Sequence, residues 1–269
     1  MQNALLAALL MSVSCGIIGT YIVSRRMVFI SGGITHASFG GVGLGYLLGF
    51  PPLGGAAIFA VAAALVTENL TRRKVLRNDS IIAIMWSLGM ALGIIFVYLA
   101  PGYAPNLMSF LFGSIITVSR TDLWLMLSLA LAVILFFSLF YRPILYVAFD
   151  EQFARTRGIP VMWFNYILII LVALTIVLSI RMAGIILVLS ILTIPQNIAN
   201  LYTNRFDRIM VWSIILGLLG SLTGLAASYF LDIPSGATII FILVVMYLSA
   251  RFIKVVTFGR QTAKKLRWN

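Results

Sequence analysis

The sequence predicts an all-α fold, a polytopic helical bundle embedded in a membrane. Of its 269 residues, 62% are hydrophobic and only 10% are charged, and the mean hydropathy is +1.09. Charged residues make up about a quarter of a typical water-soluble domain. The apolar runs are continuous and reach the roughly 20 residues that a helix needs to cross a bilayer. A β-barrel would instead show short segments of alternating polarity, so helices are predicted.

The apolar runs define nine candidate spans, with eight as the alternative count. They cover residues 4–24, 30–49, 53–70, 80–100, 122–141, 161–180, 183–202, 209–230 and 236–253. The turn beside Arg181 is very short, so one of the two segments that flank it is expected to be broken or re-entrant. Residues 104–118 are too short and too polar to span, and we expect a re-entrant or interfacial helix there.

Basic residues punctuate the apolar runs and predict the orientation of the chain. The net charge is +12, but the basic residues do not alternate with aromatic residues on one face, which argues against nucleic acid as a partner. The positive-inside rule places the basic loops at 71–78, 142–160 and 203–208 in the cytoplasm. We therefore expect a multi-pass protein of the cytoplasmic (inner) membrane, with its N-terminus outside, one transmembrane domain over 1–253 and a basic cytoplasmic tail over 254–269.

The motifs that the sequence lacks narrow the range of possible functions. The sequence contains no Gly-x-x-x-x-Gly-Lys-Ser/Thr motif, so the chain is not expected to hydrolyse ATP or to act as an enzyme. The acidic residues fall at span ends or in loops, which disfavours a proton relay: Glu68, Asp79, Asp122, Asp150, Glu151, Asp207 and Asp232. A passive pathway driven by another chain remains, with an ion-gradient-driven carrier as an alternative from a different class.

The run from Ser31 to Gly49 is rich in glycine and holds the only histidine, His36. In a helix, Gly41, Gly45 and Gly49 would form a stripe of small residues that lets another helix approach closely. Two interpretations stay open. Either the helix is tightly packed around a hydrogen-bonded histidine, or the glycines, with Gly40 on a neighbouring face, leave a narrow cavity that His36 faces. A neutral imidazole is a good ligand for a divalent first-row metal ion.

The segment from Phe149 to Pro160 is the most polar piece between two spans. Asp150 can cap a short helix, and Gly158 followed by Pro160 can end it. Such a helix, over about residues 149–158, is suited to docking in a groove of a partner. The alternative is a solvated connector. The docking interpretation assigns this contact to Phe149 and Phe153 as apolar anchors, together with Asp150, Glu151, Arg155, Arg157 and Gly158.

Several motifs occur in an order that resembles the permease subunits of zinc/manganese/iron ABC transporters. They are the segment around His36, Asn78-Asp-Ser-Ile-Ile-Ala-Ile, Leu107-Met-Ser-Phe-Leu-Phe-Gly, the loop 149–160, Leu192-Thr-Ile-Pro-Gln and Leu231-Asp-Ile-Pro-Ser-Gly-Ala-Thr. The resemblance implies a type II importer-like permease that works as a homodimer. It also implies cytoplasmic ABC ATPase subunits, an extracytoplasmic metal-binding protein, and a transported zinc, manganese or iron ion without a permanently bound cofactor.

The resemblance also assigns roles to residues. It makes 149–158 the coupling helix seated on the ATPase, and Arg25-Arg26-Met27 the basic turn before the metal-site helix. Many members of that family carry an aspartate four residues before the histidine, whereas this chain has Gly32. Two copies of His36 across a dimer axis are therefore expected to form a weak transit site. The alternative within transporters is a permease of the vitamin B12 and iron-siderophore type.

Overall fold

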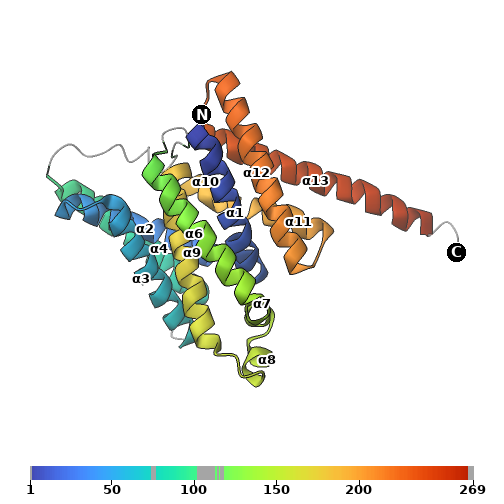
Figure 1. Ribbon diagram of the computed structural model, residues 1–269, viewed down its shortest axis with the longest axis horizontal. Coiled ribbons are helices and arrows are strands. Elements are labelled where there is room, and N and C mark those ends of the chain that lie inside the picture. The colour runs from blue at the N-terminus through green and yellow to red at the C-terminus, as the bar shows by residue number, and fades with distance from the viewer. Residues whose placement is uncertain (1, 74–76, 102–112, 114, 116–117, 266–269) are drawn as a thin grey trace.

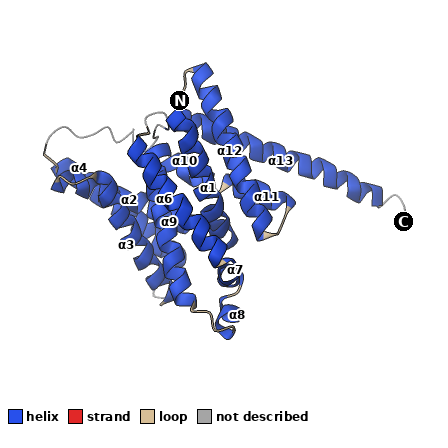
Figure 2. Cartoon of the chain, viewed as in Figure 1, coloured by secondary structure: helices blue, strands red, loops and turns tan. Residues whose placement is uncertain are grey.

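The computed structural model describes residues 2–73, 77–101, 113, 115 and 118–265, with side chains described as far as 257. This part of the chain is built of helices and loops (Figure 2). The helices are α1 Gln2–Ser24, α2 Val28–Leu48, α3 Pro52–Arg72, α4 Asn78–Leu99, α6 Arg120–Leu139, α7 Tyr141–Phe149, α8 Glu151–Thr156, α9 Val161–Ala183, α10 Ile185–Ile191, α11 Ile194–Tyr202, α12 Phe206–Leu231 and α13 Ser235–Lys265.

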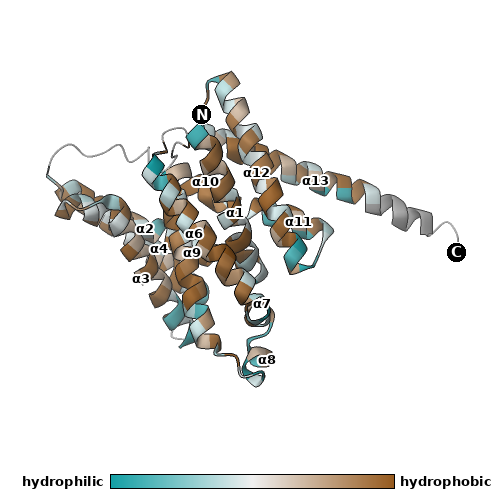
Figure 3. Ribbon diagram, viewed as in Figure 1, coloured by the Kyte–Doolittle hydropathy of each residue, from teal (hydrophilic) through white to brown (hydrophobic). Residues whose placement is uncertain are grey.

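The prediction of an all-helical membrane bundle is confirmed. Among the described residues, eight segments are long and apolar enough to cross a membrane. Helix α2 is also long enough, but its glycines, its serines and His36 lower its hydropathy. A helix that packs against α3, α4 and α9 over much of its surface does not need an apolar surface on every side. Counted with α2, nine segments of the described chain are long enough to cross a membrane, and eight of them are also apolar enough. Figure 3 shows hydrophobic residues along the middle of the long helices and hydrophilic residues near their ends.

The helices form a bundle from which the last helix diverges (Figure 1). Helix α1 packs against α6 and α12, while α2, α3 and α4 form a tightly packed group that α9 joins. The core therefore lies around α1 and α9, where Met11, Ile18, Leu168 and Ile176 are almost completely buried. Helix α13 contacts α10, α11 and α12 and then extends away from the bundle.

The segment after Arg181 is broken, as its short turn indicated. Helix α9 continues to Ala183, and Gly184 alone, with a φ of 79°, makes the turn into α10. A positive φ is readily adopted by glycine, because it has no Cβ. The helical segment from 185 to 202 is then interrupted at Leu192 and Thr193, and α11 restarts with Pro195 in its first turn, where the missing N–H of proline costs nothing.

Two predicted boundaries need correction. The loop predicted over 142–160 contains a further helix, α7, whose Pro143 lies in the first turn and whose Ile144 and Val147 are buried. Burial of this apolar face overrides the basic residue and the proline that suggested a loop. The span predicted to end at 253 belongs to a longer helix, because α13 continues to Lys265 through the first part of the predicted tail. The interfacial helix predicted at 104–118, with its Leu107–Gly113 motif, falls mostly outside the described residues.

Candidate functional site

His36 lies on α2 and stacks against Trp86 of α4. The two ring centroids are 3.9 Å apart, with 13° between the ring planes. The His36 side chain is partly exposed and Trp86 is 39% exposed, so the stacked pair lies at the edge of the bundle, where another chain or an ion can reach it. His36 stands out in the sequence as the only histidine, whereas nothing in the spacing of α4 pairs Trp86 with α2.

The other polar side chains near His36 are satisfied within α2 itself. The hydroxyls of Ser31, Thr35 and Ser38 donate to the carbonyl oxygens of Val28, Ser31 and Thr35, at 2.7, 2.6 and 2.6 Å. By contrast, the buried Nδ1 of His36 has no hydrogen-bond partner among the described residues. Among the polar side chains of this stretch, the imidazole is therefore the one with an unpaired buried nitrogen.

Neighbouring helices occupy the space beside most of the glycines of α2. A Cβ on Gly41 would collide with the backbone carbonyl of Gly55 in α3, and one on Gly45 would lie 2.8 Å from the Cα of Pro52. One on Gly40 would lie 2.9 Å from the ring of Phe59. The glycines are thus packed, as the first interpretation expects, but the Nδ1 of His36 lacks the hydrogen bond that this interpretation also expects.

Two other glycines of the segment, Gly32 and Gly49, have more space around them. Gly49 ends α2 as its left-handed C-cap, with a φ of 73° and open space where a side chain would go. Gly32 lies one turn before His36, and a Cβ there would meet only the Trp86 ring, at 3.5 Å. Ordinary van der Waals contact at this distance means that position 32 can accept a side chain beside the His36–Trp86 pair.

The described part of the chain does not by itself supply a complete metal site. The described residues contain no group of three or more His, Cys, Asp or Glu side chains that could hold a metal ion. A cavity of about 320 Å³ lies beside Trp86 and is lined by Phe29, Asp79, Ile82 and Ala83. Asp79 lies in the first turn of α4, two turns before Trp86 and on the same face of the helix. Its carboxylate is the acidic group along this face.

The short helix predicted between two spans is present as α8. The Asp150 side chain accepts a hydrogen bond from the backbone N–H of Phe153 at 2.9 Å, and Gly158 adopts a φ of 73° after the last turn. Figure 1 shows α8 at one extremity of the molecule. Phe149 is 61% and Phe153 39% exposed, and Arg155 and Arg157 are exposed as well, with the Arg157 guanidinium over the Phe153 ring.

A polar network anchors α8 to the ends of α1 and α9. Arg25 donates to Glu151 at 2.6 Å and to the Asn165 side-chain oxygen at 2.7 Å, and Asn165 donates to Glu151 at 2.9 Å. Arg25 also donates to the Tyr21 hydroxyl at 3.1 Å. Arg25 and Asn165 are 140 positions apart in the sequence, so no local pattern could reveal the network. It fixes the first turn of α8 relative to the turn that leads into α2.

The ionised form of Glu151 is favoured in this network. Partial burial alone would raise the pKa of Glu151, but hydrogen bonds from Asn165 and Arg25, together with the charge of Arg25, outweigh burial and hold the pKa below its ordinary value. A carboxyl whose pKa is lower in the folded state stabilises the fold above its unfolded pKa. That stabilisation is lost as the pH falls through the folded pKa.

Replacing Glu151 with glutamine is expected to lower the free energy of unfolding at pH 7 by about 1 kcal/mol. The effect is modest because the Arg25 and Glu151 side chains are 19% and 33% exposed, so water screens their interaction. The difference from the unmodified chain should vanish as the pH falls below the ordinary carboxyl pKa of about 4.3. Thermal melts in detergent across pH measure it. Asp207→Asn, in the more exposed pair with Arg205, is the control and should change little. An equal loss of stability at all pH values would show that the ionised form of Glu151 is not what stabilises the fold.

The comparisons with known proteins agree with one another. The chain is 44% identical over 248 residues to a membrane protein of Synechocystis sp., covering 92% of this chain and 88% of the relative. It is 35% identical over 252 residues to the manganese transport system membrane protein MntC of Halalkalibacterium halodurans, covering 94% and 86%. Its structure is similar to PsaBC from Streptococcus pneumoniae, solved in complex with a Fab, with a TM-score of 0.83, 30% identity and coverage of 93% and 90%. The sequence pattern of the ABC 3 transport family matches residues 1–254. The chain therefore belongs to the ABC 3 transport family.

Proposed function

We propose that this chain is the membrane-spanning permease subunit of an ABC importer for a divalent transition metal ion. The observation that carries the proposal is the family match over residues 1–254. The name of the MntC relative makes manganese the first metal to test, with zinc and iron as the other candidates. Because the sequence has no nucleotide-binding motif, the proposal assigns ATP hydrolysis to a separate ATPase subunit.

The geometry of α8 supports a docking role for this helix. The helix is capped, protrudes from one end of the bundle and presents the partly exposed ring of Phe153, while exposed Phe149 ends the preceding helix α7. The ends of α1, α3 and α12 meet at the same end, since Arg25 contacts Glu151, Arg72 lies over the Tyr166 ring and Phe206 contacts Phe149. This end is basic, and the positive-inside rule places it in the cytoplasm, where an ATPase subunit resides.

The incomplete ligand set at His36 supports a homodimer. One imidazole binds a metal ion weakly, but a two-fold axis beside the exposed edge of α2 and α4 would bring two imidazoles to one ion. Water and carbonyl oxygens would complete the coordination. Weak binding suits transport, because an ion held tightly would leave too slowly. An extracytoplasmic metal-binding protein would deliver the ion at the end of the bundle opposite α8.

Uptake into proteoliposomes tests the proposal. The chain is reconstituted with its ATPase subunit and its metal-binding protein, and the accumulation of radioactive manganese, zinc and iron is measured. We expect accumulation of at least one of these ions that requires ATP and is indifferent to an imposed proton gradient. Accumulation driven by an ion gradient without the ATPase would show a carrier. Transport of an iron–siderophore complex or vitamin B12 without transport of the free ions would show the other permease type.

Replacing Phe153 with aspartate is expected to weaken binding of the ATPase subunit about tenfold or more. Burial of a phenylalanine ring contributes roughly 1.5–3 kcal/mol, and 1.4 kcal/mol is a factor of ten in affinity. A pull-down at graded ATPase concentrations measures the change. Gln152→Asp is the matched control, because it places the same charge at an exposed neighbouring position. Equal effects of the two variants would assign the loss to charge and would remove Phe153 from the interface.

A further inference from the structure

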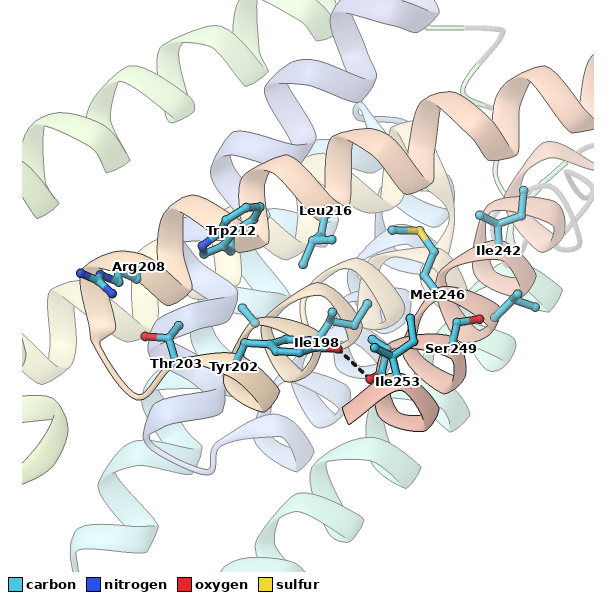
Figure 4. A pocket seen from close by; sticks show the side chains of 13 residues that line it. Ile198, Tyr202, Thr203, Arg208, Trp212, Leu216, Ile242, Met246, Ser249 and Ile253 are labelled. Carbon is cyan, nitrogen blue, oxygen red and sulfur yellow. Dashed lines mark hydrogen bonds between the residues drawn. The ribbon is translucent and has the colours of Figure 1, made fainter. Parts of the chain in front are cut away.

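An open apolar groove lies between α11, α12 and α13. Its volume is about 620 Å³, and its lining includes Leu216 of α12 and Ile242, Met246 and Ile253 of α13 (Figure 4). The groove exists because α13 packs against α11 and α12 and then diverges from the bundle. It lies along two helices that are long and apolar enough to cross a membrane.

One end of this groove is polar and positively charged. Arg208 and Trp212 of α12 and Thr203, which follows α11, lie together at this end in Figure 4. Arg208 is exposed and forms no ion pair with any described residue, whereas the nearby Arg205 is paired with Asp207 at 2.9 Å. The guanidinium at the end of the groove is therefore available to an anion.

The wall of the groove is fixed by a hydrogen bond between helices. The Tyr202 hydroxyl, at the end of α11, donates to the carbonyl oxygen of Ala250 in α13 at 2.8 Å. This bond ties α11 to α13 across the groove, so the groove is an organised part of the fold. Aromatic residues such as Tyr202 and Trp212 favour the level of the lipid headgroups. The charged end therefore lies at headgroup depth, and the apolar part extends into the hydrocarbon layer.

We propose that this groove binds an anionic phospholipid, with its phosphate at Arg208 and one acyl chain between α12 and α13. The two ends of the groove match the two parts of such a molecule, a negative headgroup and an apolar chain. Basic pockets between transmembrane helices are recognised sites for anionic headgroups. The lipid fills the space that α13 leaves as it diverges, and thereby fixes the angle of this helix against α11 and α12.

Quenching of Trp212 fluorescence by brominated lipids tests the proposal on the purified full chain in detergent. The lipids are phosphatidylglycerol and phosphatidylcholine with identical brominated chains, and the Trp212 signal is the difference between the unmodified chain and Trp212→Phe. We expect half-maximal quenching by phosphatidylglycerol at an about fivefold lower concentration than by phosphatidylcholine, which corresponds to roughly one basic side chain near the lipid surface. Equal quenching by the two lipids would overturn the proposal.

Variants test the contacts of the lipid headgroup and those of its acyl chain separately. Arg208→Gln should abolish the preference for phosphatidylglycerol and Arg208→Lys should keep it, while Arg205→Gln, outside the groove, should leave it unchanged. Ser249→Phe places a ring in the groove from its exposed side and should reduce quenching by both lipids. A preference that survives Arg208→Gln would overturn the headgroup assignment. Disulfide formation between two copies through Ser249→Cys, with Cys15 replaced, would show that a second chain fills the groove instead and would also overturn the proposal.

Discussion

Replacing His36 with alanine is expected to lower metal uptake at least about tenfold while the protein stays folded. Loss even of groups that only support a metal ligand costs roughly 10–100-fold in metal affinity or activity, and loss of a ligand itself should cost no less. The Nδ1 of His36 has no hydrogen-bond partner among the described residues, so no buried polar group is left unpaired when the imidazole is removed. Uptake in proteoliposomes is the measurement.

The stability of the same variant separates a ligand from a structural histidine. Removing the imidazole also removes its stack with Trp86, and an aromatic pair contributes about 0.5–1.5 kcal/mol. A structural hydrogen bond would cost about 1–3 kcal/mol when broken. Ser38→Ala is the matched control on α2, because its hydroxyl bonds only to the carbonyl of Thr35 in its own helix. Normal uptake by a folded His36→Ala protein would remove the ligand role.

Gly32 extends the test of His36. An aspartate at position 32 lies one helical turn before His36, and the nearest atom to its Cβ would be the Trp86 ring, at 3.5 Å. The space therefore accepts the side chain, and a carboxylate there adds a hard oxygen ligand beside the imidazole. We expect Gly32→Asp to tighten metal binding and to shift the preference among manganese, zinc and iron. If the preference among the metal ions is unchanged, position 32 does not contact the transported ion.

Much of the fold could be predicted from the sequence because membrane helices carry their signal locally. Continuous apolar runs predicted the long helices to within a few residues, and the short turn at Arg181 indicated the break after α10. Helix α7 was missed because its stability depends on burying Ile144 and Val147, which is a tertiary effect. The length of α13 was missed because a basic sequence can continue an apolar helix without any residue that breaks it.

The candidate site was predictable only where its signal is local. The cap at Asp150 and the turn at Gly158 are short-range patterns, and the structure confirms both. The contacts of His36 with Trp86 and of Arg25 with Asn165 join helices that are distant in sequence, and one sequence gives no pairing information for them. The glycines of α2 were predictable in part. Their spacing indicates that another helix approaches closely, but it does not say which helix.

Replacing Gly41 with alanine is expected to destabilise the protein by roughly 1–3 kcal/mol or more and to reduce metal uptake as a consequence. The added Cβ would collide with the backbone carbonyl of Gly55, and a backbone cannot move aside as the end of a side chain can. Overpacking of this kind typically costs roughly 1–3 kcal/mol and occasionally more. Without a hydrophobic effect between helices in lipid, the close approach of α2 and α3 rests on such small residues.

Gly54→Ala provides the control, because Gly54 also lies in α3 but has no atom within 4 Å of its added Cβ. Alanine favours helix by about 1 kcal/mol over glycine, so this variant should be unchanged or slightly more stable. Both variants are compared by thermal melts in detergent and by uptake. Because α2 carries His36 and contacts α4 on its other side, a shift of α2 away from α3 would also displace the imidazole from its place against Trp86. Equal melting temperatures for the two variants would show that α2 and α3 approach less closely than the Gly41–Gly55 contact requires.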